Sequence, residues 1–283
     1  MSVKAAVEPN PRISGLLRAV TLLNLVVLVG AGAGLFFWPR VVRPIWPWDI
    51  APYHAAFVGA LYLASAPAIA VVAYQGRWSP ARVVLPMLLA FAATGLVTSV
   101  LSLAQFHFER WSTWVWFFIF TLLPLTAAAY LWRYRRQPPA LAQPTPAAWR
   151  AVSRVAAIPL LLYGLGQFVA PVTLSGFWPW PVDAFHGRLY SGSFLALAFG
   201  LWLTARAASR WERRLPALNL SFFGGLAILG LLTVDATVGR VDWSRPGPWL
   251  WIAALAALAL LGLAGLWQSL TPLTHVEGAA PRT

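Results

Sequence analysis

The chain lacks cysteine entirely and has few charged residues for its length. Among its 283 residues there is no cysteine, and only 10% are charged. The absence of cysteine excludes disulfide frameworks, thiolate catalysis, iron–sulfur clusters and zinc sites built on thiolates. The scarcity of charge, beside 59% hydrophobic residues, excludes a water-soluble globule. The composition therefore predicts an integral membrane protein.

Acidic residues are the second shortage. The chain has 21 lysines and arginines against eight aspartates and glutamates, which gives a net charge of +13. In a soluble protein this balance would indicate a nucleic-acid partner, but basic loops beside lipid headgroups explain it in a membrane protein. We therefore expect membrane lipid as a partner and no nucleic acid. Any metal or haem would have to use carboxylates, methionines or the four histidines, which are His54, His107, His186 and His275.

Apolar runs long enough to cross a bilayer, which takes roughly 20 helical residues, recur along the chain. The expected spans are residues 16–37, 53–74, 81–104, 114–132, 152–172, 185–205, 216–234 and 248–266. Backbone groups in lipid must pair internally, and runs without alternating polarity satisfy this only as helices. The predicted fold class is an all-α bundle of eight transmembrane helices.

Basic residues set the expected orientation. On the side opposite the N-terminus lie Arg40, Arg43, Arg110, Arg188, Arg240 and Arg245, which leaves 15 of the 21 lysines and arginines on the N-terminal side. Lysine and arginine accumulate in short cytoplasmic loops. Both termini are therefore expected in the cytoplasm, and the protein in the cell (inner) membrane.

The sequence repeats itself at an offset of 132 residues. Gly32, Gly34, Phe36, Pro39, Trp46, Pro47, Trp48 and His54 recur as Gly164, Gly166, Phe168, Pro171, Trp178, Pro179, Trp180 and His186. This predicts two tandem four-helix units, residues 1–132 and 152–283 with a short C-terminal tail, joined by a Pro/Arg-rich cytoplasmic linker, 133–151. Units with an even number of crossings are parallel repeats. The first span is expected to be retained rather than cleaved as a signal peptide, because it has a counterpart in the second unit.

The glycine pairs that end the first helix of each unit admit two interpretations. A nucleotide-binding loop would need a third glycine and a preceding strand, and the sequence has neither. Small residues in membrane helices allow close approach of a neighbouring helix. The glycines therefore predict helix packing.

A W-P-W segment follows in each unit, on the expected outer side, and contains Trp46 and Trp48 or Trp178 and Trp180. One interpretation is an interfacial belt or structural cap, because indole combines an apolar ring with a polar N–H. A belt alone predicts enrichment at both membrane faces, whereas 11 of the 17 tryptophans lie on this side. The second interpretation is therefore an aromatic-lined ligand site, and the sequence leaves both open.

His54 and His186 occupy equivalent positions six residues after each W-P-W. Paired imidazoles on neighbouring helices can ligate haem iron or a divalent metal. The alternative is that each ring forms a hydrogen bond with a carbonyl or a headgroup. On the sixth expected helix, Asp183, His186, Tyr190 and Ser193 share one face, which is polar for its depth.

Two further polar groups lie on the expected outer side. Thr94, Thr98, Ser102 and Gln105 form a stripe on the third helix, which predicts either hydrogen bonds to backbone carbonyls or the polar wall of an outward-open cavity. Asp235, Arg240 and Asp242 stand where the first unit has Leu103, Phe108 and Arg110. Because charged groups near a membrane surface usually pair, Arg188 is expected to meet Asp183 or Asp235.

The favoured hypothesis is a multi-pass membrane protein that binds a small apolar or lipid-like molecule at an outward-facing, tryptophan-rich site. The candidate ligand-binding residues are Trp46, Trp48, Trp178, Trp180, His54, His186, Tyr190, Gln105, Asp235 and Arg188. One alternative is a bis-histidine haem or metal redox protein, and another is a non-catalytic scaffold or assembly partner of a membrane complex. No nucleophile, base and orienting group can be placed together, so no catalytic residue or cofactor is assigned.

Overall fold

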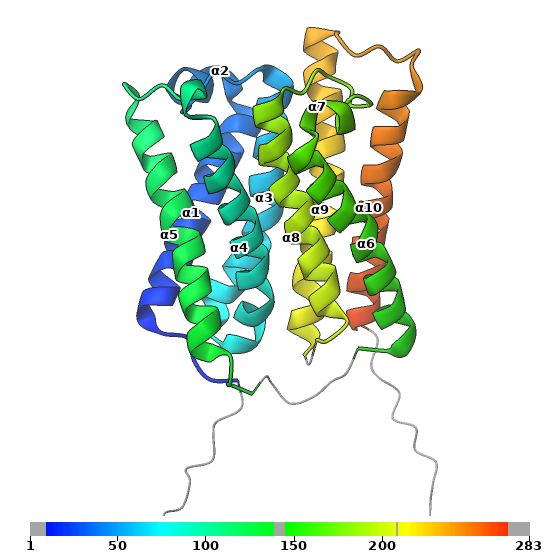
Figure 1. Cartoon of the computed structure of the whole chain (residues 1–283). Helices are drawn as coiled ribbons and strands as arrows, with labels where there is room; N and C mark the ends of the chain where they lie inside the picture. The colour runs from blue at the N-terminus through cyan, green and yellow to red at the C-terminus, as the bar shows by residue number, and fades with distance from the viewer. Residues whose placement is uncertain (1–9, 139–144, 208, 271–283) are drawn as a thin grey trace, which may run out of the picture.

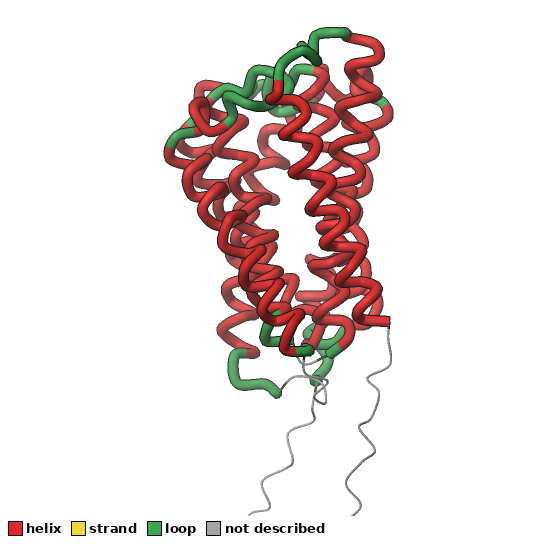
Figure 2. The backbone as a smooth tube through the Cα atoms, turned by 90° about the vertical axis from the view of Figure 1, so that its right-hand side faces the viewer, coloured by secondary structure: helices red, strands yellow, loops and turns green. Residues whose placement is uncertain are grey.

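The computed structural model describes residues 10–138, 145–207 and 209–270 of the chain, and in these ranges it is an all-helical bundle without strands (Figure 1). The long helices run side by side and the loops lie at the two ends of the bundle (Figure 2). They are α1 (Gly15–Phe37), α3 (Pro52–Gln75), α4 (Trp78–Leu101), α5 (Trp111–Tyr134), α6 (Ala147–Val169), α8 (Ala184–Thr204), α9 (Arg210–Val238) and α10 (Pro246–Leu270). The all-α prediction is confirmed.

Short helical pieces follow two of the long helices at the end that is uppermost in Figure 1. They are α2 (Pro39–Val42) with the 3-10 turn Arg43–Ile45, and α7 (Pro171–Leu174); a further 3-10 turn, Leu103–Gln105, follows α4. Helices α1 and α6 end at the residue before a proline. The C-cap residues are Trp38 and Ala170, whose backbone N–H groups donate the last helical hydrogen bonds to Gly34 O and Gly166 O. Proline then occupies the first position of the short helix, where its missing N–H costs nothing.

Among the described residues, seven helices are long and apolar enough to cross a membrane, which supports a multi-pass membrane protein. They are α1, α3, α4, α5, α6, α9 and α10. Helix α8 is of similar length but is less apolar, because its first three turns contain His186, Arg188, Tyr190 and Ser193. It also packs between α6 and α4, so most of its side chains are buried by protein.

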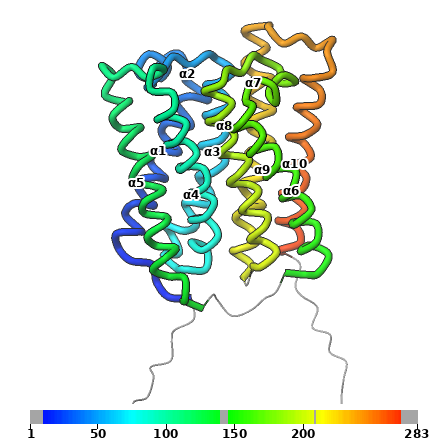
Figure 3. Tube along the Cα trace, viewed as in Figure 1, coloured from blue at the N-terminus to red at the C-terminus, as the bar shows by residue number. Residues whose placement is uncertain are grey.

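The helices pack in a regular set of pairs. Helix α1 lies against α3, and α6 lies against α8; α3 also contacts α9, and α8 also contacts α4. The remaining large contacts join α4 to α5 and α9 to α10. The first half of the chain, blue to green in Figure 3, occupies one side of the bundle and the second half the other.

Glycines lie where the helices approach most closely, as the sequence predicts. A Cβ atom added at Gly32 would lie 3.0 Å from the Tyr62 Cβ on α3, and one added at Gly164 would lie 2.9 Å from the Leu195 side chain on α8. Alanine at either position would require the neighbouring side chain or helix to shift. The packing interpretation of these glycines is confirmed.

The expected helix bounds differ from the structure mainly where polar residues begin a helix. Helix α9 starts at Arg210 rather than at residue 216, because Ser209 caps it and accepts a hydrogen bond from the Glu212 N–H. Hydropathy detects only the apolar part of such a helix, whereas capping starts it a turn earlier. Helix α4 is likewise shifted toward the N-terminus and ends at Leu101. Linker residues 139–144 and the tail 271–283, with His275, lie outside the described ranges.

Candidate functional site

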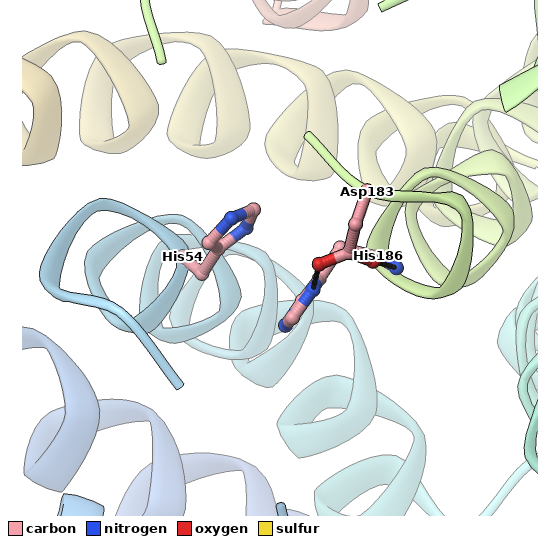
Figure 4. A group of neighbouring side chains, drawn as sticks. All are labelled: His54, Asp183 and His186. Carbon is pink, nitrogen blue, oxygen red and sulfur yellow. Dashed lines mark hydrogen bonds and ion pairs between the residues drawn. The ribbon is translucent and has the colours of Figure 1, made fainter. Parts of the chain in front are cut away.

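The two equivalent histidines meet in the interior, at the contact between the two halves of the bundle (Figure 4). His54 is the third residue of α3 and His186 is the third residue of α8, so both project from a first helical turn. Their rings stack with centroids 4.0 Å apart and planes inclined by 24°. Each histidine is 5% exposed. The sequence predicted their equivalence but not this contact.

Hydrogen bonds fix the orientation of the His186 ring. Asp183 is the N-cap of α8, where one carboxylate oxygen accepts from the His186 backbone N–H at 2.9 Å and the other lies 2.7 Å from His186 Nδ1. The indole N–H of Trp48 donates to His186 Nε2 at 3.1 Å. An imidazole that accepts at Nε2 carries its proton on Nδ1, where it can donate to the carboxylate. Asp183 therefore both caps the helix and sets the tautomer of His186.

Two carboxyl groups outside the helices at this end have lowered pKa values. Partial burial raises the pKa of Asp183, but hydrogen bonds and charge interactions with His186 lower it by more, so the carboxyl stays ionised well below its ordinary range. A hydrogen bond from the Arg110 guanidinium is the main cause of the lowered pKa of Asp49. Both groups are negatively charged at neutral pH.

His54 has different partners from His186. Its Nδ1 lies 2.6 Å from the hydroxyl of Tyr190 on α8. The ring of Trp180 lies 6.2 Å from His54, the same distance that separates Trp48 from His186. Yet the Trp180 N–H has no hydrogen-bond partner among the residues that the structure describes. The two histidines therefore share a position but not a hydrogen-bonding pattern.

Three side chains of this centre could hold a metal ion. His54, Asp183 and His186 each offer one ligand atom, and these atoms lie within 4.8 Å of one another. However, both nitrogens of His186 and the Nδ1 of His54 already form hydrogen bonds, so an ion bound at any of these three atoms would have to displace Trp48, Tyr190 or the carboxylate. A single haem cannot use both rings as axial ligands in this arrangement, because rings stacked at 4.0 Å leave no space for a porphyrin between them.

The W-P-W tryptophans point inward rather than toward the headgroups. All four are buried, and each pair packs edge to face, with centroids 5.4 Å apart for Trp46 and Trp48 and 5.2 Å apart for Trp178 and Trp180. The exposed tryptophans at this end of the bundle are Trp38, Trp111, Trp114 and Trp249. At this end of the bundle, only these exposed tryptophans can form an interfacial belt. The tryptophans of the W-P-W segments are part of the core.

The loop between α4 and α5 holds the first W-P-W segment in place. The His107 backbone N–H donates to Pro47 O at 2.8 Å, and the Arg110 guanidinium donates to Trp46 O at 2.8 Å. The Thr113 hydroxyl also lies 3.3 Å from Pro47 O. Buried carbonyl groups need donors, and those of Trp46 and Pro47 find them in this loop and in the first turn of α5.

Two apolar side pockets lie directly beneath the W-P-W segments. The first pocket, between α1, α3 and α5, has a volume of about 270 Å³ and is lined by residues that include Val27, Ala31, Ile45, Trp46, Tyr62 and Ile119. The second pocket, between α6, α8 and α10, has a volume of about 380 Å³ and is lined by residues that include Pro159, Tyr163, Phe177, Trp178, Phe194 and Trp251. Each contains the first tryptophan of its W-P-W segment.

Arg188 does not form the expected salt bridge with either Asp183 or Asp235. Arg188 donates to the Phe168 carbonyl at 3.3 Å, and Asp183 pairs with His186. The Asp235 carboxylate accepts hydrogen bonds from the Tyr53 hydroxyl, the Trp243 indole N–H and the backbone N–H groups of Arg240 and Val241. The predicted salt-bridged pair is therefore wrong, and Asp235 instead organises the loop between α9 and α10.

The expected polar stripe on α4 is divided by the end of the helix. Thr94 packs beside Gly192 of α8, where an added Cβ would lie 3.1 Å from its side chain, and Thr98 is fully buried. Gln105 lies beyond the helix, on an exposed 3-10 turn. Gln105 is thus separated from the other candidate residues, whereas the Trp, His and Tyr190 candidates come together.

Tyr53 and Tyr163 belong to the same region, although sequence reasoning did not select them. The Tyr53 ring stacks on Trp180 with planes inclined by 9°, and the Tyr163 hydroxyl accepts from the Trp178 N–H at 2.8 Å. At the 132-residue offset, Tyr163 corresponds to Ala31 and Tyr53 corresponds to Phe185. A search for polar residues that differ between otherwise matching positions would have found both.

Comparison with known protein families, curated proteins and solved structures gave no match to this chain.

Proposed function

We propose that this protein crosses the cell (inner) membrane eight times, with both termini in the cytoplasm, and binds small apolar or lipid-like molecules in its two side pockets. In this proposal the chain consists of two parallel four-helix units, and α8 is the eighth span. Helix α8 does not need an apolar surface on every side, because α4 and α6 cover it. The excess of lysine and arginine on the N-terminal side supports the orientation.

Helix packing supports the two-unit arrangement. If α1, α3, α4 and α5 are matched in order to α6, α8, α9 and α10, each major contact of one set has a counterpart. The pair α1–α3 matches α6–α8, the pair α4–α5 matches α9–α10, and α3–α9 matches α8–α4. Close contacts match as well, because a Cβ at Gly34 would meet Val42 at 2.6 Å and one at Gly166 would meet Leu174 at 2.5 Å.

The observation that carries the ligand-binding proposal is the correspondence between the two pockets. Six lining residues of the first pocket coincide with six of the second at the 132-residue offset, namely Val27 with Pro159, Ala31 with Tyr163, Ile45 with Phe177, Trp46 with Trp178, Tyr62 with Phe194 and Ile119 with Trp251. Accidental packing defects would not be expected at corresponding places. Both volumes exceed the roughly 150 Å³ of engineered apolar cavities that bind benzene.

A single substitution in the first pocket tests this proposal. Val27 lines the pocket, whereas the adjacent Val26 is exposed on the outer surface of α1. In nanodiscs, Val27→Trp is expected to remove one bound apolar molecule per chain from the native mass spectrum, because the indole fills the pocket. Val26→Trp, the matched control, should retain it. Equal occupancy in the two variants, or no bound molecule in the wild-type protein, would contradict the proposal.

A metal centre at the stacked histidines is the second candidate function, and the proximity of His54, Asp183 and His186 is the observation that favours it. An ion would exchange the hydrogen bonds of the two rings for metal–nitrogen bonds of about 2.0–2.1 Å. Elemental analysis of protein purified from metal-replete cells, compared with His54→Gln, tests this candidate. A stoichiometric metal that is lost in the variant would support it, and metal-free wild-type protein would remove it.

A further inference from the structure

A hydrogen-bonded tyrosine lines the second pocket. Tyr163, on α6, accepts from the Trp178 N–H at 2.8 Å and donates to the Leu174 carbonyl at 3.2 Å. Its ring packs edge to face on Phe194, with centroids 4.8 Å apart. The phenol therefore satisfies a buried indole N–H, fills space beneath the W-P-W segment and finds an acceptor for its own proton.

The first pocket has the same surroundings without the tyrosine. Ala31 stands in the place of Tyr163, Val42 in the place of Leu174 and Tyr62 in the place of Phe194, and all three line the pocket together with Trp46. Trp46 is 7% exposed, as Trp178 is, but its N–H has no hydrogen-bond partner within the described part of the chain. A buried donor without an acceptor is costly and uncommon in native proteins.

Two features of the surrounding geometry match in the two pockets. The first tryptophan of each segment packs against the second at a similar distance, 5.4 Å between Trp46 and Trp48 and 5.2 Å between Trp178 and Trp180. Gly34 of α1 lies close to Val42 of α2, and Gly166 of α6 lies close to Leu174 of α7. The short helix therefore packs on the preceding long helix in the same way in both halves. The space that the Tyr163 ring fills in the second pocket thus corresponds to space beside Ala31 in the first.

We propose that the first pocket binds an apolar molecule with a hydroxyl-bearing aromatic ring, which lies where Tyr163 lies in the second pocket and accepts a hydrogen bond from Trp46. This inference rests on the proposed function and names the chemical class of its ligand. The ring packs on Tyr62, and its hydroxyl donates to the Val42 carbonyl. A plain hydrocarbon chain fills the same volume but leaves the indole N–H without an acceptor.

The test compares two probes that differ by one oxygen atom, 4-butylphenol and butylbenzene. Equilibrium dialysis of each probe against the full-length protein in nanodiscs, with empty nanodiscs subtracted, gives its affinity. One neutral hydrogen bond contributes up to roughly a tenfold difference in binding. We expect 4-butylphenol to bind about five- to tenfold more tightly than butylbenzene after each affinity is corrected for partition into the lipid. Trp46→Phe, which keeps the ring and removes the N–H, should abolish this preference.

Exchanging the two residues between the pockets provides a second readout. Ala31→Tyr supplies the phenol covalently and should remove the high-affinity site, whereas Tyr163→Ala should create a second one and raise the stoichiometry from one to two. Tyr163→Ala leaves a cavity, so 4-butylphenol should also raise its thermal unfolding temperature more than that of the wild type. This readout keeps the test decisive if Ala31→Tyr fails to fold.

The outcomes separate this inference from the proposed function. Equal affinity for the two probes, with binding still lost in Val27→Trp, would overturn the phenol assignment and leave an apolar pocket. Binding of neither probe above the empty-nanodisc background would overturn both proposals. A preference for 4-butylphenol that persists in Trp46→Phe would also overturn the assignment, because Trp46 is then not its donor.

Discussion

The two halves of the chain present the same aromatic residues to different polar partners. At the 132-residue offset, three polar residues of the second half stand opposite small or apolar ones in the first: Asp183 opposite Ala51, Tyr190 opposite Val58, and Tyr163 opposite Ala31. The first two form hydrogen bonds with the stacked histidines, and the third satisfies Trp178. The matching residues thus form the same aromatic core in both halves. The differing residues determine which buried polar groups have a hydrogen-bond partner within the chain.

Replacement of the second tryptophan of each W-P-W segment gives the largest expected difference between the halves. Trp48→Phe leaves His186 Nε2 without its donor, whereas Trp180→Phe removes an N–H that has no partner in the described residues. Both changes remove similar ring volume from the core. The free energy of unfolding in detergent should therefore fall by about 1–3 kcal/mol more for Trp48→Phe. Equal losses would show that the Trp48–His186 hydrogen bond contributes nothing to stability.

The long helices could be predicted from sequence, because about 20 consecutive apolar residues in lipid have one backbone solution. Helix α8 shows the limit of that reasoning: its polar first turns lower its hydropathy, since they face the interior rather than lipid. The helix bounds do not follow from hydropathy, because caps such as Ser209 start helices outside the apolar runs. Composition and periodicity therefore identify the elements, while polar side chains at their ends determine where they begin.

The candidate site was predictable only in part. The matching residues at the 132-residue offset identified the W-P-W tryptophans and the histidines, and the periodicity of α8 placed His186 and Tyr190 on one face. Nothing in the sequence indicates that the indoles turn inward, because that depends on donors from a loop some 60 residues away, such as Arg110. Tyr163 was missed because a lone tyrosine on an apolar helix resembles an interfacial residue. Its importance follows only from the position of Trp178.

Removal of the Tyr190 hydroxyl gives a smaller effect at the other histidine. Tyr190→Phe deletes the hydrogen bond to His54 Nδ1, and the first half has only Val58 at the corresponding position. The expected loss is about 1 kcal/mol in the free energy of unfolding. Tyr74→Phe is the matched control, because that ring is exposed at the end of α3. If Tyr190→Phe were as stable as the control, the asymmetry around His54 would have no energetic consequence.

The carboxylate that caps α8 gives a pH-dependent difference. The folded-state pKa of Asp183 lies below its unfolded value, so its ionised form stabilises the fold above about pH 4, and this contribution is lost progressively as the pH falls further. Asp183→Asn keeps a helix cap but cannot ionise. The unfolding temperature of the wild type should exceed that of Asp183→Asn at pH 7, and the gap should narrow below about pH 4. A gap that is constant from pH 7 to pH 3 would exclude a charge effect.

The smallest expected effect concerns the way each half holds its outer loop. In the second half, Asp235 accepts four hydrogen bonds from the Tyr53, Arg240, Val241 and Trp243 groups. In the first half, the corresponding position is Leu103, and the charged contact is made instead by Asp49, whose side chain is 83% exposed and lies 3.3 Å from Arg110. Exposed ion pairs contribute about 0–1 kcal/mol and are screened by salt.

Asp49→Asn should therefore change the unfolding temperature less than Asp235→Asn does, and its small effect should disappear in about 1 M salt, where charges are screened within a few ångströms. Asp235→Asn should retain its effect in salt, because it weakens directed hydrogen bonds to several donors rather than a charge pair in water. The measurement is the unfolding temperature of both variants at low and high salt. Equal salt dependence would mean that both loops are held by charge, and the contrast between the halves would then be confined to the residues that surround the tryptophans and histidines.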